Sequence, residues 1–239
     1  MRGVLAAALL LALSLPGCGV SPREPGSDDF AAARARMVRE QLEARGIRDR
    51  RVLEAMGRVP RHELVPESLR ARAYDDGPLP IGEGQTISQP LVVATMSQAL
   101  ALQGDERVLE VGTGSGYQAA VLAELAAEVY TIELEPALAA RAARDLERLG
   151  YGAKLHTRLG DGYAGWPEAA PFDAIVVTAA PDHVPQPLVE QLVAGGRLVI
   201  PVGGRGGQQL LLLTRTESGV VREELLPVMF VPLRRDPDE

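Results

Sequence analysis

Apolar side chains recur at helical spacing through the first hundred residues of the chain. The spacing predicts helices over 30–45, 50–59 and 91–102, and a broken helical stretch over 61–74. Gly46 is a natural stop for the first helix, Asp49 can cap the second, and Pro90 suits the first turn of the last one. This N-terminal part is therefore predicted to be mainly helical.

The pattern changes at Arg107, where short β-rich runs begin to alternate with helical ones. The predicted strands are 107–111, 129–133, 153–159, 172–178 and 196–202, and the predicted helices are 116–125, 136–150 and 185–194. Such alternation indicates a parallel sheet with both faces covered by helices. Two further runs, 208–216 and 220–233, have no helix between them and are predicted to form an antiparallel pair at the sheet edge.

Length and charge narrow the class of protein. The 239 residues suffice for one domain with a full core, and a formal net charge of −7 disfavours a broad nucleic-acid surface. We predict that 29–239 is one domain, with a helical part and lid at 29–105, a cofactor-binding core at 106–203 and edge strands at 204–239.

The first 28 residues read as an addition to that domain. Arg2 precedes an apolar run at 4–15 that is too short to span a bilayer but suits a signal peptide. Leu15, Gly17 and Cys18 then resemble the bacterial lipoprotein cleavage box, so residues 1–18 are predicted to be a lipoprotein signal and 19–28 a tether. A lipid anchor through Cys18 would place the protein in the cell envelope, facing the periplasm. The alternative is a cytoplasmic protein with an upstream start codon assigned in error.

The strongest chemical signal is the glycine-rich stretch VLEVGTGSGYQAA at 108–120. A strand ends at Val111, three glycines make a turn and a helix follows, as in nucleotide-binding α/β folds. The spacing is G-x-G-x-G with Tyr117 in the sixth place, whereas the dinucleotide fingerprint has glycine there. Glu110 would disfavour a pyrophosphate and suit a ligand with a cationic end, such as S-adenosylmethionine.

Two further acids lie at the ends of the next two predicted strands. Glu133 lies at the usual place of an acid that accepts hydrogen bonds from both ribose hydroxyls of a nucleotide. Asp161 and Gly162 lie where a carboxylate and a backbone amide could bind the edge of an adenine. Three acids beside one glycine turn predict a cofactor crevice for S-adenosylmethionine rather than NAD.

Other catalytic chemistries have weaker support. No pair among His62, His156 and His183 has metal-ligand spacing, and Cys18 is the only cysteine, so no metal site is predicted. Thr113 breaks the G-x-S-x-G motif that a hydrolase nucleophile would need. The roles of Tyr163, Trp166 and His183 stay open between lining the site and packing the core.

Several segments together resemble a known family. EVGTGSG at 110–116, GDGYAGW at 160–166 and FDAIVVTAAP at 172–181 resemble class I methyltransferases. VPRHELVP at 59–66, LPIGEGQTISQP at 79–90 and FVPL at 230–233 are similar to the protein-L-isoaspartate O-methyltransferase family. The resemblance runs from about Met37 to Leu233 and implies a doubly wound, mostly parallel, seven-stranded Rossmann-like sheet with N-terminal helices and an antiparallel edge.

The resemblance also implies an activity and its residues. The activity is methyl transfer from S-adenosylmethionine to the free α-carboxylate of L-isoaspartyl residues in damaged proteins and peptides, which starts repair through a methyl ester and a succinimide. The family's active-site hydroxyl falls on Ser88. Expected cofactor contacts are Thr86, Ile87, Glu110, Gly112, Gly114, Glu133, Leu134, Asp161 and Gly162, and expected acceptor contacts are Thr86, Ser88 and Val231.

The residues around Ser88 suit such an acceptor. A carboxylate with an ordinary pKa near 4 is already a nucleophile at neutral pH, so it needs positioning and not deprotonation. Thr86 and Ser88 supply hydroxyls, and the stretch has no base. We expect Ser88 to orient the acceptor and the loop at 82–90 to close as a lid.

Three alternatives remain at this point. The first is a class I methyltransferase with a small molecule or another protein group as acceptor, although TAAP at 178–181 favours an oxygen acceptor. The second is an NAD-dependent oxidoreductase, which the glycine spacing and Glu110 disfavour. The third is a lipid-anchored binding protein without activity.

Overall fold

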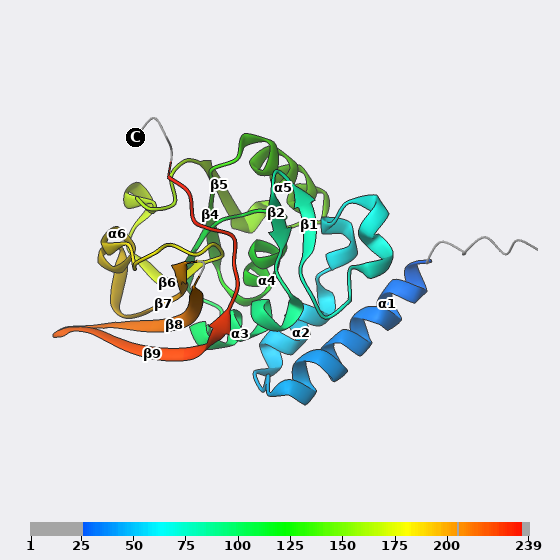
Figure 1. The fold of residues 1–239 in the computed structure, drawn as a ribbon, viewed down its shortest axis with the longest axis horizontal. Helices are drawn as coiled ribbons and strands as arrows, with labels where there is room; N and C mark the ends of the chain where they lie inside the picture. The colour runs from blue at the N-terminus through cyan, green and yellow to red at the C-terminus, as the bar shows by residue number, and fades with distance from the viewer. Residues whose placement is uncertain (1–25, 205, 236–239) are drawn as a thin grey trace, which may run out of the picture.

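The computed structural model describes residues 26–204 and 206–235 and centres on a seven-stranded sheet (Figure 1). The strand order is β5-β4-β3-β6-β7-β8-β9. The strands are β3 (Arg107–Val111), β4 (Glu128–Glu133), β5 (Leu155–Leu159), β6 (Phe172–Val177), β7 (Leu192–Gly204), β8 (Gly207–Thr216) and β9 (Gly219–Val228). Strands β3 to β7 pair in parallel, and β7, β8 and β9 pair antiparallel. The predicted mostly parallel sheet with an antiparallel edge is confirmed.

The helices lie where the apolar spacing places them, with one exception. They are α1 (Ser27–Arg36), α2 (Arg50–Arg58), α3 (Pro90–Leu100), α4 (Tyr117–Leu125), α5 (Pro136–Arg148) and α6 (Gln186–Glu190). Asp49 caps α2 by accepting from the Arg51 backbone N–H at 2.9 Å, an interaction that contributes about 1 kcal/mol. The predicted helix 185–194 is wrong beyond Glu190, because Leu192 begins β7 and is buried against the sheet.

The stretch from Met37 to Tyr74 continues the helical layer in short turns. α1 runs on into a π-helical segment (Met37–Leu42) and a 3₁₀ turn (Glu43–Arg45), which Gly46 ends with φ +100°. The broken stretch forms two 3₁₀ segments, Arg61–Leu64 and Glu67–Arg72. These elements pack at the end of the molecule opposite the β8–β9 hairpin (Figure 1).

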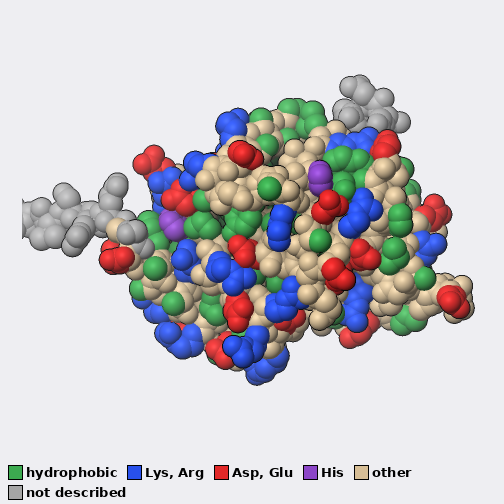
Figure 2. Space-filling view, turned by 180° about the vertical axis from the view of Figure 1, so that it is seen from behind, with side chains coloured by type: hydrophobic (Ala, Val, Ile, Leu, Met, Phe, Trp, Pro, Cys, Tyr) green, Lys and Arg blue, Asp and Glu red, His purple; other side chains and the backbone are tan. Residues whose placement is uncertain are grey.

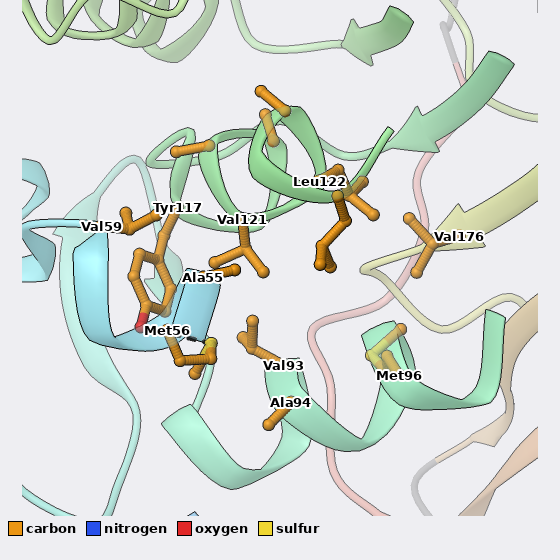
Figure 3. Packing of buried hydrophobic residues seen from close by; sticks show 14 of the residues in the cluster. Ala55, Met56, Val59, Val93, Ala94, Met96, Tyr117, Val121, Leu122 and Val176 are labelled. Carbon is orange, nitrogen blue, oxygen red and sulfur yellow. Dashed lines mark hydrogen bonds between the residues drawn. The ribbon is translucent and has the colours of Figure 1, made fainter. Parts of the chain in front are cut away.

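Two apolar clusters hold the sheet between its helices. The larger one joins α2, α3, α4 and α5, and Figure 3 shows Met56 of α2, Val93 of α3 and Val121 of α4 converging. The second cluster lies around α6 and includes Leu188 and Phe172, both fully buried. Helix α4 is buried along nearly its whole length, so the turn that precedes it is held firmly in place.

Two sequence predictions concern parts of the chain at its ends. The predicted signal, Cys18 and the tether up to residue 25 lie outside the described residues; the last two tether residues, 27 and 28, belong to α1. β7 runs to Gly204 and so crosses the predicted boundary between 203 and 204. Over residues 26–204 and 206–235, no helix is both long and apolar enough to cross a bilayer.

Candidate cofactor and acceptor site

The glycine turn connects the central strand to the buried helix α4. Gly112, Gly114 and Gly116 have φ values of +99°, +53° and +82°, a conformation that side chains rarely adopt. A Cβ on Gly112 would also collide with the Thr178 hydroxyl, which donates to the Gly112 carbonyl at 2.5 Å. The turn therefore requires glycine, and its backbone at Gly112 and Gly114 lines a cavity where the strand order reverses between β3 and β6.

Glu133 is buried at the end of β4 and is fixed by two backbone donors. Its carboxylate accepts from the Gly114 N–H at 2.7 Å and from the Glu135 N–H at 2.9 Å. The side chain is 8% exposed and lines the cavity over the glycine turn. Because a carboxylate oxygen can accept more than one hydrogen bond, Glu133 can still receive two hydroxyl groups of a ligand.

The segment after β5 places two glycines, and not its acid, against the cavity. Gly160 and Gly162 line the cavity, while the Asp161 carboxylate accepts from the Tyr163 N–H at 2.8 Å and is 9% exposed. A Cβ on Gly162 would collide with Val111, so this glycine allows the loop to pack on β3. The structure thus puts Asp161 beside the cavity wall without making its side chain part of it.

The predicted loop around GEGQTISQP is partly a β-hairpin. β1 (Leu79–Gly82) and β2 (Gln85–Ile87) pair antiparallel, and Pro90 begins α3 directly behind Ser88. Arg141 of α5 donates to the Ile81 carbonyl at 2.6 Å, and Ile81 is fully buried close to Gly114. The hairpin, which we call the lid hairpin (residues 79–87), is therefore fastened over the glycine turn.

One cavity, open at its mouth, joins these elements. Thr86, Ile87, Ser88, Gly112, Gly114, Glu133, Leu134, Gly162 and Val231 were predicted as site residues and line it. Ser88 is half-buried, and within the described chain neither its hydroxyl nor that of Thr86 has a hydrogen-bond partner. The two hydroxyls are therefore free to bind a ligand.

The prediction for Glu110 needs correction. Its side chain is fully buried on β3 and does not line the cavity. Burial raises the pKa of Glu110 to about 8, even though the Thr131 hydroxyl donates to it at 2.5 Å. Glu110 is therefore a neutral acid at pH 7 that packs beneath the turn, and it offers no charge to a cationic ligand.

The raised pKa of Glu110 predicts a pH-dependent stability. The ordinary pKa of a glutamic acid is 4.5, and that of folded Glu110 is about 8. Between these two pH values the folded protein holds one proton more than the unfolded chain. The free energy of unfolding should therefore fall as pH rises through this window, by up to about 1.4 kcal/mol per pH unit. Glu110→Gln should remove that slope, so urea unfolding should find the variant similar to wild type near pH 5 and more stable near pH 8. Parallel pH curves for the two proteins would show that the carboxyl is ionised when folded.

The side chains whose roles were open lie away from the cavity. Trp166 packs edge-on against Tyr130 at 5.4 Å, within the core cluster around α6. Tyr163 lies under the Arg235 guanidinium at 4.0 Å, and exposed His183 hydrogen-bonds its neighbour Asp182 at 2.5 Å. All three are absent from the cavity lining, as far as the described residues define it.

Two functional positions were missed by sequence reasoning. Thr178 lines the cavity beside Ser88, and its place as the first residue after β6 was the available signal. Arg141 belongs to a helical surface pattern, and its bond to the lid hairpin has no local sequence signal. Among the described residues no group of three or more His, Cys, Asp or Glu side chains could hold a metal ion.

The chain is similar to known proteins of one family. A profile of the protein-L-isoaspartate(D-aspartate) O-methyltransferase family matches residues 33–237. A relative from Anaeromyxobacter, protein-L-isoaspartate O-methyltransferase 2, is 60% identical over 96% of this chain and 96% of its own length. A relative from Gloeobacter violaceus, a protein-L-isoaspartate O-methyltransferase, is 57% identical over 84% of this chain and 98% of its own length.

Solved structures that are similar to the chain carry the same enzyme name as these relatives. A protein-L-isoaspartate O-methyltransferase superposes with a TM-score of 0.75 and 30% identity, over 83% of this chain and 65% of that longer one. A second structure is a Plasmodium falciparum chain described as a protein-L-isoaspartate O-methyltransferase in complex with S-adenosyl-L-homocysteine. It superposes with a TM-score of 0.75 and 26% identity, over 85% of this chain and 99% of that one.

Proposed function

The chain belongs to the protein-L-isoaspartate(D-aspartate) O-methyltransferase family, and we propose how its own residues carry out the methyl transfer of that family. The enzyme transfers a methyl group from S-adenosylmethionine to the free α-carboxylate of an isoaspartyl residue in a damaged protein. The ester then collapses to a succinimide, which reopens partly to normal aspartate. The alternatives of an NAD-dependent oxidoreductase and of another methyl acceptor are set aside by the family match.

The residues of the cavity fit this cofactor. Gly112 and Gly114 leave the turn without side chains, and Glu133 offers carboxylate oxygens to a pair of ribose hydroxyls. Among the described residues that line the cavity, the cation is Arg234, which lies 3.5 Å from Glu135, so this part of the chain offers no free cluster of cations to a pyrophosphate. When bound, the cofactor supplies an electrophilic methyl group on a sulfonium. Leu134, Ile87 and Gly162 would hold the cofactor by contact, and Asp161 would act by fixing the backbone beside Gly162, since its carboxylate accepts from the Tyr163 N–H.

The observation that carries the choice of acceptor is the distribution of charge along the cavity. Among the described lining residues the acid is Glu133, at the end of β4, whereas the hydroxyls of Thr86, Ser88 and Thr178 lie on the side of Ser88, where no described acid lines the cavity. A carboxylate acceptor would be repelled by an acid and would need no base, because it is ionised at neutral pH. Ser88 and Thr86 donate hydrogen bonds that orient the acceptor, and Val231 packs against it. The lid hairpin keeps water away from the reacting groups.

Paired peptides test this proposal. The full-length protein is incubated with methyl-labelled S-adenosylmethionine and two peptides that differ only in one isoaspartyl or aspartyl linkage. Base-labile label is expected on the isoaspartyl peptide alone, because only that linkage leaves a free α-carboxylate at the residue. Label on both peptides would point to a less selective acceptor site, and label on neither would overturn the assignment.

The N-terminal segment supports a second proposal, concerning location. We propose that residues 1–18 are a lipoprotein signal and that Cys18 carries a lipid anchor that holds the enzyme at the periplasmic side of the cell envelope. The support is the apolar run after Arg2 and the small Gly17 directly before Cys18. An exported enzyme would also need S-adenosylmethionine outside the cytoplasm, which makes cytoplasmic location the opposing outcome.

Fractionation of bacteria that make the full chain distinguishes the two locations. Wild type is expected in the membrane fraction with a fatty-acid label, and Cys18→Ala should lose the label. Inhibition of the lipoprotein signal peptidase should leave the longer precursor uncleaved. An unlabelled wild-type protein in the cytosolic fraction would contradict the anchor and leave the enzymatic assignment intact.

A further inference from the structure

Arg141 of helix α5 contacts the lid hairpin across 60 residues of sequence. Its guanidinium donates to the Ile81 carbonyl at 2.6 Å, and its side chain is half-buried. Within residues 26–204 and 206–235, no other side chain hydrogen-bonds to the backbone of 79–87. This bond is therefore the polar connection between the hairpin backbone and the cofactor-binding core.

Arg141 differs from the arginines that pair with acids. Arg148, two turns later on the same helix, pairs with Glu63 at 2.9 Å. Figure 2, which views the molecule from behind, shows acidic and basic side chains interspersed on that face. Arg141 forms no ion pair with any described residue and donates to a backbone carbonyl instead. Because a charged donor makes a stronger hydrogen bond than a neutral one, this guanidinium is suited to holding a backbone in place.

The lid hairpin is too short to hold its position alone. β1 and β2 pair at three positions, and the register shifts between Pro80 and Gly82. Pro80 also lacks the backbone N–H that a regular ladder would use. An isolated two-stranded hairpin is marginally stable in water at best. The position of this hairpin therefore depends on its contacts with the rest of the protein.

The base of the hairpin has contacts of its own. Asp76 accepts from the Gln89 side chain at 2.6 Å, which joins the chain before β1 to the chain after β2. Arg61 is fully buried and donates to the Ala73 carbonyl at 2.7 Å, which fixes the segment that leads into the hairpin. The tip at 82–84 is exposed. The tip can therefore move away from the core while the base stays in place, once the bond to α5 opens.

Ile81 is the residue through which the hairpin covers the glycine turn. Its side chain is fully buried, and a Cβ on Gly114 would lie 3.6 Å from it. Thr86 and Ile87, on the second strand of the hairpin, line the cofactor cavity. A displaced hairpin would uncover the turn and remove part of the cavity wall. A ligand in the cavity would then dissociate faster.

We propose that Arg141 is a positioning residue for the methyl transfer, which fixes the lid hairpin over the cofactor cavity through its bond to Ile81. By holding Ile81 against the glycine turn, it slows the release of S-adenosylmethionine and of the product S-adenosylhomocysteine. The inference rests on the proposed function, since it concerns the same cavity. It assigns a separate task to each end of the hairpin, with a fixed base and a tip that opens for exchange of the cofactor.

Release of S-adenosylhomocysteine tests the Arg141–Ile81 bond. Stopped-flow displacement from the full-length protein measures the dissociation rate constant, and calorimetric titration measures the dissociation constant. Arg141→Ala should raise both by about tenfold, which corresponds to about 1.4 kcal/mol, near the lower end for a hydrogen bond to a charged group. Arg141→Lys keeps a charged donor and should recover part of the affinity. Arg144→Ala removes an exposed arginine one turn along α5 and should behave as wild type.

Hydrogen exchange of the protein without ligand separates this role from a general loss of structure. In Arg141→Ala the backbone amides of 81–87 should exchange about tenfold faster than in wild type, because the open hairpin is more populated. The amides of β3 and β4 should exchange at wild-type rates, since the sheet does not depend on this bond. Equal release rates, equal hairpin exchange, or faster exchange throughout the sheet would each overturn the role of Arg141. Failure of wild type to bind S-adenosylhomocysteine would instead overturn the proposed function.

Discussion

Ser88→Ala is expected to lower kcat for an isoaspartyl peptide by about 100-fold, while the dissociation constant of S-adenosylhomocysteine changes less than about threefold. The reason is geometric. The acceptor carboxylate is already a nucleophile, so the enzyme accelerates the transfer by holding it in line with the methyl group. Ser88 lines both the cofactor cavity and the hollow that adjoins it, and its hydroxyl has no partner in the described chain. Its loss removes orientation without removing a cofactor contact.

Two controls distinguish this effect from a loss of structure. Because the Ser88 hydroxyl makes no hydrogen bond within the described protein, the free energy of unfolding of Ser88→Ala should stay within about 0.5 kcal/mol of wild type. Ser88→Thr retains a hydroxyl and should recover part of kcat. Calorimetric titration with S-adenosylhomocysteine measures the cofactor side independently. Equal losses in turnover and in cofactor affinity would show that Ser88 belongs to the cofactor site instead.

The site could be predicted from sequence wherever its residues follow local rules. The glycine turn, Glu133 and Gly162 lie at or shortly after the ends of predicted strands, and the carboxyl ends of parallel strands meet at one edge of a sheet. Pro90 likewise fixed the start of α3 behind Ser88. Local sequence order was enough for these positions because the fold repeats one strand–helix unit.

The remaining features depend on contacts between distant segments. Glu110 looked like an acid facing a ligand, but whether a strand residue points into the core or out of it is decided by the layers packed on the sheet. The Arg141 bond to Ile81 spans 60 residues, and the Gln208 bonds to Phe230 span 22. The lid hairpin has only three or four residues per strand, too few to show a clear alternation. Such features become visible only in the folded protein.

Glu133→Gln is expected to weaken S-adenosylhomocysteine binding by about 100-fold and to leave kcat at saturating cofactor less affected. The carboxylate accepts from the Gly114 and Glu135 N–H groups and is proposed to accept from both ribose hydroxyls. An amide can replace one oxygen but turns an N–H donor toward the other partners, so at least one donor loses its acceptor. Hydrogen bonds to a buried charged group are worth about 1.5–3 kcal/mol each, and about 2.7 kcal/mol corresponds to 100-fold.

Glu135→Gln is the matched control for this prediction. Glu135 follows the same strand two residues later and pairs with Arg234 at 3.5 Å, and it is not among the residues that line the cavity. Its variant should bind S-adenosylhomocysteine within about twofold of wild type, since a half-exposed ion pair contributes little. Calorimetric titration of both variants uses two ligands, S-adenosylhomocysteine and its 2′-deoxyribose analogue. The comparison shows whether the loss of affinity comes from the ribose hydroxyls. If Glu133 receives the ribose hydroxyls, the deoxy analogue should lose less affinity in Glu133→Gln than the parent ligand does. Equal losses for both ligands would mean that Glu133 acts only through the Gly114 backbone and shapes the glycine turn without touching the cofactor.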